Sequence, residues 1–519
     1  SGRLQRPLSA THQRHTEATK QRRGWVPRRV PTILLYLQRS RTQNAGVINQ
    51  YDAVVVGSGP NGLAAAIEVA RRGGRVVTYE AAAEIGGGTR TQELTAPGFL
   101  HDVCAAVHPL GVASPFFRSL PLDDHGLEWL HFDVPLSHPL PGDSAAVLHH
   151  SLIETAVDLG TDEGRYEKLM APLVEHFEDL LDDVLGPLLT VPQHPIRLSR
   201  FGVAAMLPAT LLAGRFSTEQ AKALIAGLAA HSVAPLDRPF TAAIGMVLGA
   251  AGHAHGWPIA KGGSAAIGRA MADYLEDLGG EIVTDHPVES LDEVPTADVY
   301  LLDVMPAAAV GIAGDRVGRS RGRLESWKHG PGVFKVDWAL NAPIPWSDPW
   351  STRAGTVHVG GTMREVVAAE AASAEGRLTD TPFVLVSQPT LIDHTRAPEG
   401  KHVAWAYCHV PNGSGADMTF AIEKQIERFA PGFRDTIIAR HTMNPADYAA
   451  YNANYVGGDI GGGALNISQL LARPRLSANP YRIGDQVYLC SSATPPGAGV
   501  HGMCGFHAAQ AALEDTARG

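Results

Sequence analysis

The hydrophobic residues of this chain first form a regular pattern between positions 51 and 80. Residues 53–56 are a short apolar run, typical of a strand that is buried on both faces. Residues 63–70 are small and apolar apart from Glu68 and predict a helix, and residues 75–79 predict a second strand. This order of strand, helix and strand indicates a βαβ unit, in which a crossover helix joins two parallel strands.

A helical pattern follows in the region 151–256. In residues 166–189, apolar side chains recur at helical spacing while acidic side chains occupy the other faces, which predicts an amphipathic helix. Residues 201–216 and 218–230 predict further helices with large apolar faces. The run 239–260 carries no charge, but glycine, histidine and proline interrupt it, so it predicts a core or cavity-lining segment rather than a membrane span.

The α/β pattern returns after residue 257. A helix is predicted at 265–278 and strands at 281–284 and 299–303. The next segments favour strands of an antiparallel sheet, at 334–340, 357–360, 382–387 and 402–410, and 420–429 predicts a helix. The chain ends with a strand, a glycine-rich loop and a helix at 487–490, 491–502 and 502–515, which we expect to return to the first sheet.

These patterns predict a discontinuous organisation. A nucleotide-binding domain of the Rossmann-like α/β class is expected in three parts, with a substrate domain inserted between them. The expected segments are an N-terminal extension (1–50), the three parts of the nucleotide-binding domain (51–150, 257–310 and 481–519), a helical insertion or substrate cap (151–256), and a substrate domain with an antiparallel sheet (311–480).

The turn after the first predicted strand carries a G-x-G-x-x-G motif. Gly57 allows a tight turn, Gly59 lets a pyrophosphate approach the backbone, and Gly62 lets the helix pack closely on the sheet. The helix N-terminus then offers N–H groups and a positive dipole end to phosphates. Glu80 ends the second strand, where a ribose-binding carboxylate is expected. The complete loop is Gly57, Ser58, Gly59, Pro60, Asn61 and Gly62.

Composition and charge narrow the class of protein. The chain has 519 residues, of which 45% are hydrophobic and 18% charged, which is typical of a globular protein with a large core. Residues 1–50 carry a net charge of +9, which leaves −19 for the remainder. An acidic body argues against nucleic acid as a partner. None of the four cysteines forms a C-x-x-C pair, so we expect neither a redox disulfide nor a metal ligand set.

The first fifty residues differ from the rest. They are rich in arginine, serine and threonine, lack periodicity, and are expected to be poorly ordered. We expect a cytoplasmic protein, or a mitochondrial one if this segment is a transit peptide, whose composition it resembles.

Five stretches together resemble the phytoene-desaturase-like flavoproteins, a branch of the FAD enzymes with the glutathione-reductase fold. They read VVVGSGPNGLAAAIEVARRG, AVHPLGVASPFF, LVSQPTLIDHTRAPEGKHVAWAYCHVP, NYVGGDIGGG and LCSSATPPGAGVHGMCGFHAA. The chain is most similar to the branch named after pyridine nucleotide-disulphide oxidoreductase domain-containing protein 2, over roughly 51–516. The resemblance implies a glutathione-reductase-type, Rossmann-like FAD-binding domain with a discontinuous substrate domain. The second helix–strand–strand unit, within 257–306, carries no phosphate-binding G-x-G-x-x-G motif, so a built-in NAD(P)H domain is not expected.

The resemblance implies where FAD would lie. Glycines 57, 59 and 62 would face the pyrophosphate and Glu80 the adenosine ribose. The remaining implied contacts are Gly86, Gly87 and Arg90 beside the phosphates, Val288 at the adenine, and Ser492, Gly499, Val500 and Gly502 towards the flavin. The sequence departs from the pattern of many relatives in two places. Gly88 stands where a basic residue is common, and Ser491 and Ser492 stand where an acid is common.

Candidate catalytic residues are few, because a flavin needs little more than a C–H bond aimed at its N5 atom. His501, in the C-terminal glycine loop, is the first candidate for a base near the ring. His253 and Lys261 are further candidates, and His108 and His231 are weaker ones. The pair His253 and His255 lacks a third ligand at suitable spacing, so no metal is expected.

The leading hypothesis is an FAD-dependent oxidoreductase that desaturates or dehydrogenates a hydrophobic, isoprenoid or polyene-like substrate, with oxygen or a quinone as electron acceptor. An amine or alcohol oxidase of the same fold is one alternative, with Trp257, Trp338 and Trp405 as a candidate aromatic cage. A flavin-binding regulatory or scaffold protein with little turnover is another. Contact with a membrane surface and a homodimer are further expectations.

Overall fold

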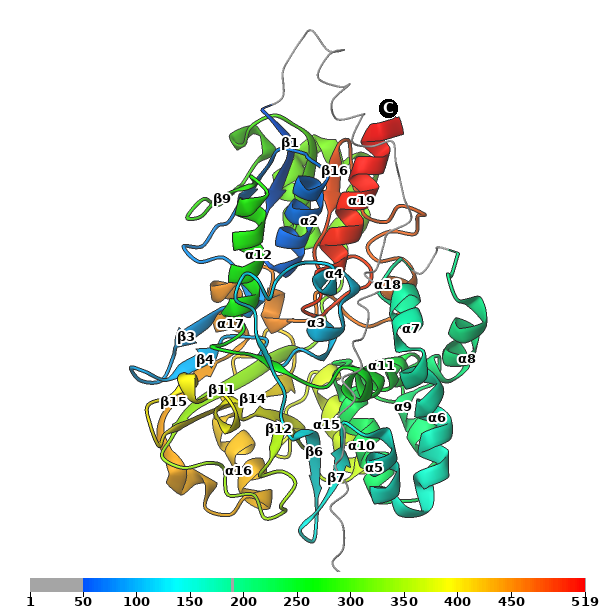
Figure 1. Cartoon of the computed structure of the whole chain (residues 1–519), viewed down its shortest axis with the longest axis vertical. Coiled ribbons are helices and arrows are strands. Elements are labelled where there is room, and N and C mark those ends of the chain that lie inside the picture. Colours follow the sequence, from blue (N-terminus) through cyan, green and yellow to red (C-terminus); the bar gives the residue numbers. More distant parts are fainter. Residues whose placement is uncertain (1–49, 188–190, 519) are drawn as a thin grey trace, which may run out of the picture.

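The computed structural model describes residues 50–187 and 191–518, so the N-terminal extension lies almost wholly outside the described residues. A smaller sheet of five parallel strands forms one end of the molecule (Figure 1). It brings together strands from three distant segments, in the order β16-β10-β1-β2-β9: Val487–Leu489, Ala297–Leu302, Tyr51–Val56, Val76–Tyr79 and Glu281–Val283. Because both faces of this sheet are covered, its central strands are apolar except at Asp52, Thr78 and Asp298.

Helices cover the smaller sheet on both sides. On one face lie α2 (Pro60–Arg71), α12 (Ala265–Asp277) and α19 (Met503–Arg518), which share one apolar core. On the other face lies α13 (Pro306–Ala313), in a separate core. Figure 1 shows α19 and α2 side by side, so the C-terminal helix returns to the first βαβ unit.

The larger sheet has seven strands and is mostly antiparallel. Its order is β15-β11-β14-β13-β12-β6-β7, with bounds Ile437–Met443, Gly332–Leu340, His402–Val410, Val384–Ser387, Ala354–Val359, Val134–Leu140 and Ser144–Leu148. One face packs on α16 (Thr419–Phe429) in an apolar core, and the other faces the middle of the molecule. Strands β6 and β7 lie in this sheet, although the expected segment 51–150 assigned them to the nucleotide-binding domain.

The helical region lies beside the larger sheet. Its helices are α5 (Leu152–Asp158), α6 (Glu163–Glu175), α7 (Phe177–Val184), α8 (Pro195–Ala205), α9 (Ala209–Ala213), α10 (Glu219–Ala230) and α11 (Thr241–Ala254). The single helix predicted at 166–189 is two helices, because the backbone leaves helical geometry at His176 (φ −121°, ψ 35°). The stretch predicted as one helix at 201–216 is likewise divided between α8 and α9. No helix among the described residues is long and apolar enough to cross a membrane.

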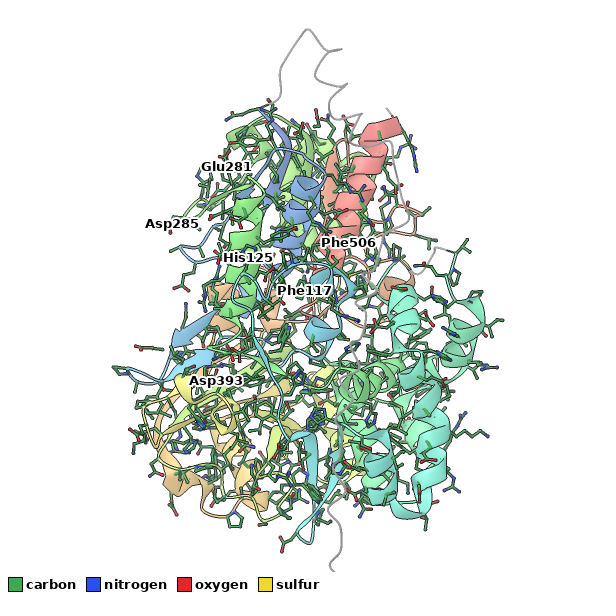
Figure 2. The ribbon with its side chains drawn as sticks, in the orientation of Figure 1. Phe117, His125, Glu281, Asp285, Asp393 and Phe506 are labelled. Carbon is green, nitrogen blue, oxygen red and sulfur yellow. The ribbon has the colours of Figure 1, made fainter. Side chains whose placement is uncertain are left out.

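Short elements complete the fold and join the two sheets. Figure 2 shows Glu281 and Asp285 at the outer edge of the smaller sheet, and Phe117 and Phe506 on the side where α4 and α19 meet. The remaining elements are α3 (Pro109–Ala113), α4 (Pro115–Arg118), α14 (Arg321–Glu325), α15 (Met363–Ala374), α17 (Pro445–Tyr451), α18 (Ile467–Leu471), β3 (Thr91–Glu93), β4 (Leu100–Asp102), β5 (Trp129–Leu130) and β8 (Ile259–Ala260).

Candidate active site

A cavity of about 1280 Å³ runs between the two sheets. At the smaller sheet it is lined by the loops that follow β1, β2 and β10, and by the C-terminal glycine loop. At the larger sheet it is lined by β13, β14 and the apolar faces of α8 and α11. The cavity therefore has a polar, glycine-rich part and an apolar part, as expected of a site that holds a nucleotide and an apolar ligand.

The first glycine loop is packed so closely that side chains would not fit. Gly57 has φ +99°, and a Cβ on Gly62 would lie 1.9 Å from the carbonyl oxygen of Gly57. Gly59 occupies the N-cap position of α2, and having no side chain it leaves the helix end open towards the cavity. This is the geometry that lets a phosphate approach backbone N–H groups.

Asp303, which follows β10, was not predicted as a site residue, but its side chain packs against this loop. Its Oδ2 accepts a hydrogen bond of 2.9 Å from the N–H of Gly62, and a Cβ on Gly59 would lie 2.8 Å from the same oxygen. Burial, together with the nearby charge of Glu80, raises the pKa of Asp303 to about 7, although the Gly62 hydrogen bond opposes this shift. A strand ending in an acid beside a glycine loop is the one signal that the sequence offers for it.

Glu80 lines the cavity, but its carboxylate already has several protein partners. Oε2 accepts hydrogen bonds from the backbone N–H and the hydroxyl of Ser58, at 2.9 and 2.7 Å. Oε1 accepts from the N–H of Ala82 and from Arg90, at 3.0 and 3.1 Å. Glu80 thus holds the two phosphate-facing loops together, and a ribose hydroxyl would have to share these oxygens.

The second glycine loop packs directly on the first. The N–H of Gly86 donates to the carbonyl of Ser58 at 3.0 Å, and a Cβ on Gly87 would lie 3.1 Å from the Cα of Gly59. Arg90 points back onto its own loop, donating to the carbonyls of Glu84 and Ile85. Its guanidinium is therefore bound by protein groups, although the residue still lines the cavity.

The C-terminal loop closes the same cavity from the other side. Arg473, which was not predicted, donates to the carbonyl of Ser492 from both Nε and Nη2, at 3.1 and 2.8 Å. The same side chain donates to the carbonyls of Gly461 and Gly462, so it ties two glycine loops together. No local motif marks Arg473, because its partners are backbone carbonyls that only the fold brings near.

The predicted cofactor residues gather at this end of the molecule. Those that line the cavity are Gly57, Gly59, Pro60, Asn61, Glu80, Gly87, Arg90, Val288, Ser492, Gly499 and Val500. Those that lie behind its wall and shape the loops are Ser58, Gly62, Gly86 and Gly502.

The predicted catalytic residues lie in three separate places. His501 is in the cavity wall, but its Nδ1 accepts from the N–H of Met503 at 3.0 Å, and the imidazole also hydrogen-bonds the backbone of Ala498 and Gly497. Burial lowers the pKa of His501 to about 4. Because both sides of the ring bind backbone groups, this geometry favours a neutral imidazole that stabilises the loop over the predicted role as a base.

The other two candidates lie away from the cavity wall. His253 on α11 is hydrogen-bonded to the hydroxyl of Tyr166 at 2.8 Å, inside the helical region. Lys261 is exposed and pairs with Glu128 at 2.8 Å. Neither position supports the predicted catalytic role, because a residue that reacts with a ligand must reach it.

The weaker candidates His108 and His231 both line the cavity. His108 Nε2 lies 2.8 Å from the hydroxyl of Ser264, which itself donates to the carbonyl of Ala105. His108 is therefore the donor, and it is tied to the start of α12. Among the described residues no group of histidine, cysteine, aspartate and glutamate is arranged to hold a metal ion.

Comparisons with known proteins agree with this fold. Residues 55–120 match the model of the NAD(P)-binding Rossmann-like domain family. The chain is 28% identical to pyridine nucleotide-disulfide oxidoreductase domain-containing protein 2 of Mus musculus, over 90% of this chain and 94% of the relative. It is 26% identical to phytoene dehydrogenase of Streptomyces griseus, over 74% of this chain and 77% of the relative.

Solved structures share the fold. Cyclohexylamine oxidase from Brevibacterium oxydans IH-35A superposes with a TM-score of 0.56 at 17% identity, covering 90% of this chain and 99% of that one. The predicted resemblance and the Rossmann-like α/β fold with an antiparallel second sheet are confirmed. The chain is therefore similar to oxidoreductases, and among them to the phytoene desaturases.

Proposed function

We propose that this chain binds FAD and uses it to oxidise an apolar, isoprenoid or polyene-like substrate. The observation that carries the proposal is the cavity that joins the glycine loops of the smaller sheet to the apolar faces of α8 and α11. The glycine loops fit a dinucleotide, because a Cβ at Gly62 or Gly87 would fill the space that the backbone needs there. When bound, FAD supplies a flavin that accepts a hydride at N5.

The chain's own residues would then bind, orient and exclude water. The glycine loops and the N-terminus of α2 would hold the pyrophosphate, and Glu80 would meet the adenosine ribose. Val288 lies in the cavity wall with Tyr79 and His286, whose rings are 4.8 Å apart, and this group would flank the adenine. Phe201 and Val247 would cover an apolar substrate.

Reconstitution and anaerobic reduction test the proposal. The purified protein should take up FAD and show a flavin spectrum, and a lipid polyene should bleach that spectrum without oxygen. Re-oxidation by air or by a quinone would then identify the electron acceptor. A protein that cannot take up FAD would refute the proposal.

A pair of matched variants separates the substrate part from the cofactor part. Val247 lines the apolar cavity on α11, whereas Val157 on α5 is 55% exposed and lies outside the cavity wall. Val247→Trp should slow bleaching by the polyene about tenfold or more and leave FAD bound, because the indole fills space that the substrate needs. Val157→Trp should change neither the bleaching rate nor FAD binding.

An amine oxidase is the second candidate, because solved structures of the same fold include cyclohexylamine oxidase. Trp405 and Tyr407 stack in the cavity wall with ring centroids 5.5 Å apart. Trp338 of the predicted cage lies on the opposite face of the sheet, packed on Phe433. Bleaching by alkylamines but not by polyenes would favour this candidate. If no substrate class changed the spectrum, the regulatory alternative would be favoured.

The helical region also suggests how an apolar substrate reaches the cavity. Leu198 and Phe201 of α8 line the cavity, while Ile196 and Val203 of the same helix are 71% and 67% exposed. We propose that this exposed surface contacts a membrane. Co-sedimentation with lipid vesicles should fall on changing Ile196 and Val203 together to serine, and unchanged co-sedimentation would contradict the contact.

A further inference from the structure

A row of side chains crosses the face of the larger sheet that meets the cavity. His358 on β12 is paired in register with Leu385 on β13, which is paired with Tyr407 on β14. His231, the residue that follows α10, lies over His358 with their Nε2 atoms 3.0 Å apart. His231, Leu385 and Tyr407 line the cavity, and His358 lies behind them.

The surroundings of His358 determine which of its nitrogens carries the proton. The residue is fully buried, and its Nδ1 has no hydrogen-bond partner among the described residues. This nitrogen lies against α10, where a Cβ on Gly227 would be 2.7 Å away. A proton on Nδ1 would leave a buried N–H without an acceptor, at a cost of about 1–3 kcal/mol. The proton therefore sits on Nε2 and is donated to Nε2 of His231.

A neighbouring histidine has the same arrangement. His138 Nε2 lies 2.7 Å from the carbonyl oxygen of Gly361, and since a carbonyl only accepts, His138 must donate from Nε2. Its Nδ1 also faces Gly227, where a Cβ would lie 2.7 Å away, and has no partner among the described residues. Gly227 thus packs against two unprotonated ring nitrogens, as the tautomer of His358 requires.

The state of His231 follows from that of His358. Because Nε2 of His231 accepts a hydrogen bond, the neutral ring carries its proton on Nδ1. Burial lowers the pKa of His231 to about 3, so the ring is neutral at physiological pH. Burial also raises the pKa of Tyr407, so its hydroxyl keeps its proton. Two neutral donors, the Nδ1–H of His231 and the hydroxyl of Tyr407, therefore belong to this wall of the cavity.

The charged groups behind this wall are already paired. Glu370 lies 2.8 Å from Nδ1 of His409, and Asp337 lies 2.5 Å from Nζ of Lys335. None of these four side chains lines the cavity. An ammonium or carboxylate group at this wall would be buried without a countercharge, which is costly.

We propose that this wall of the cavity binds a neutral hydrogen-bond-accepting oxygen, of the carbonyl type, carried by the apolar substrate. His231 and Tyr407 donate to that oxygen, and His358 is a positioning residue that sets the tautomer of His231. The proposal rests on the proposed function and deepens it, because it narrows the substrate to an oxygenated apolar molecule in place of a plain hydrocarbon or an amine.

Binding of three matched probes to the FAD-reconstituted protein tests the proposal. The probes are an isoprenoid ketone, the hydrocarbon of equal length and the primary amine of equal length. Tryptophan fluorescence reports binding, because Trp257 and Trp405 line the cavity. The ketone should bind about tenfold more tightly than either other probe, as one or two net hydrogen bonds allow. Equal affinity of ketone and hydrocarbon would overturn the inference.

Single variants assign that preference to its residues. Tyr407→Phe and His231→Leu should each reduce the ratio of ketone affinity to hydrocarbon affinity about three- to tenfold. Tyr274→Phe, on α12 and outside the cavity wall, is the matched control and should change nothing. A ketone preference that survives both cavity variants would overturn the assignment.

The role of His358 has its own readout. In protein labelled with ¹⁵N-histidine, His231 should give the chemical shifts of an Nδ1–H tautomer. His358→Leu should remove that signature, because Nε2 of His231 then no longer accepts a hydrogen bond from His358. An Nε2–H tautomer of His231 in the unchanged protein would overturn the inference. If FAD uptake failed while the ketone preference remained, the proposed function would fail and this site would stand.

Discussion

The carboxylate of Asp303 accepts a hydrogen bond of 2.9 Å from the backbone N–H of Gly62, in the first turn of α2. An acid at the end of β10 thus binds one of the N–H groups at the helix end that the glycine loop offers to a phosphate. Its raised pKa, about 7, shows that the negative form is unfavourable there even before a phosphate arrives. A bound dinucleotide would add negative charge to the same place.

Asp303→Asn should therefore stabilise the protein at alkaline pH. The folded-state pKa lies above the ordinary value of 3.8, so stability is fully present below about pH 4 and is lost as the pH rises through 7. At pH 8 the variant should be more stable by about 1–3 kcal/mol, and its FAD affinity should no longer fall between pH 6 and pH 8. Denaturant unfolding and FAD titration measure both.

The control for this change is Asp285→Asn. Asp285 is exposed at the edge of the smaller sheet (Figure 2), so the substitution removes the same charge without altering a buried carboxyl. Equal pH profiles for Asp303→Asn and the unchanged protein would show that Asp303 is not protonated in the folded state.

Gly62→Ala should abolish FAD binding or prevent folding, because its Cβ would lie 1.9 Å from the carbonyl oxygen of Gly57. The expected loss of stability is about 3 kcal/mol or more. Gly311→Ala, within α13 and with open space around its Cβ, should instead stabilise by about 0.5–1 kcal/mol. Thermal unfolding with and without FAD distinguishes these outcomes, and a folded, FAD-binding Gly62→Ala protein would contradict the packing.

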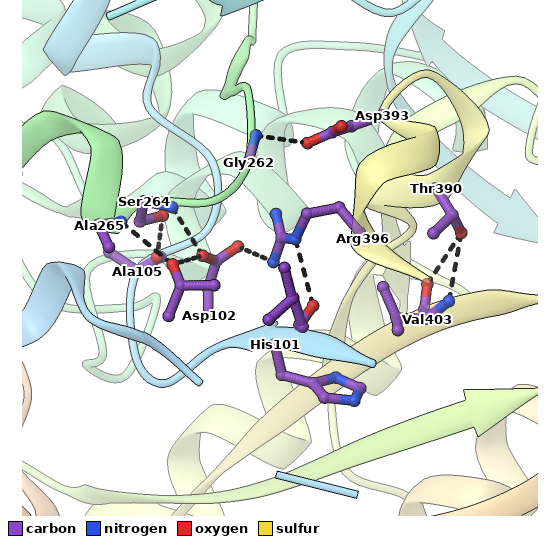
Figure 3. Close-up of polar contacts among 12 residues, drawn as sticks. His101, Asp102, Ala105, Gly262, Ser264, Ala265, Thr390, Asp393, Arg396 and Val403 are labelled. Atoms are coloured by element: carbon purple, nitrogen blue, oxygen red, sulfur yellow. Dashed lines mark hydrogen bonds and ion pairs between the residues drawn. The ribbon is translucent and has the colours of Figure 1, made fainter. Parts of the chain in front are cut away.

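Asp102 and Arg396 form a buried ion pair that joins the two parts of the fold, at 2.8 Å (Figure 3). Asp102 also accepts from the N–H of Ser264 at the start of α12. Arg396→Met should destabilise the protein by about 3–5 kcal/mol, because Asp102 is left buried without its partner. Arg353→Met, which breaks an exposed pair with Asp133, should cost at most about 1 kcal/mol. Similar costs for both variants, measured by urea unfolding, would refute this prediction.

His501 should contribute to the stability of the fold, and its protonation should not appear in the pH dependence of the reaction. Both sides of its ring bind backbone groups, and burial lowers its pKa to about 4. His501→Leu should lower the thermal midpoint by several degrees, since it removes a cap from α19 and frees the glycine loop. The pH profile of flavin reduction should keep its shape between pH 6 and pH 8. A group with a pKa near 6.5 that disappears in the variant would restore His501 as the base.

Local pattern was sufficient for the secondary structure near Tyr51 and in the C-terminal helix, at the two ends of the described part of the chain. The strand, glycine turn and helix from Tyr51 to Arg71 obey short-range rules, and so does the C-terminal return to the same sheet. The break between α6 and α7 was missed, because apolar side chains keep helical spacing across His176. Periodicity reports which face is buried and not whether the backbone is continuous.

The sequence by itself determined the Rossmann-like fold around the first strand, because the glycine turn consists of neighbouring residues whose glycines are required by backbone geometry. Only the tertiary structure decided which polar groups are free to act. In the fold, the carboxylate of Asp303 accepts a hydrogen bond from Gly62, and both sides of the His501 ring bind backbone groups. His253 and Lys261 bind other side chains and lie away from the cavity wall. The outcomes for Asp303, His253 and Lys261 depend on partners more than 80 residues away along the chain, such as Tyr166 for His253, which no local pattern records. The ring of His501 binds near neighbours in the sequence, and only its burial depends on the fold.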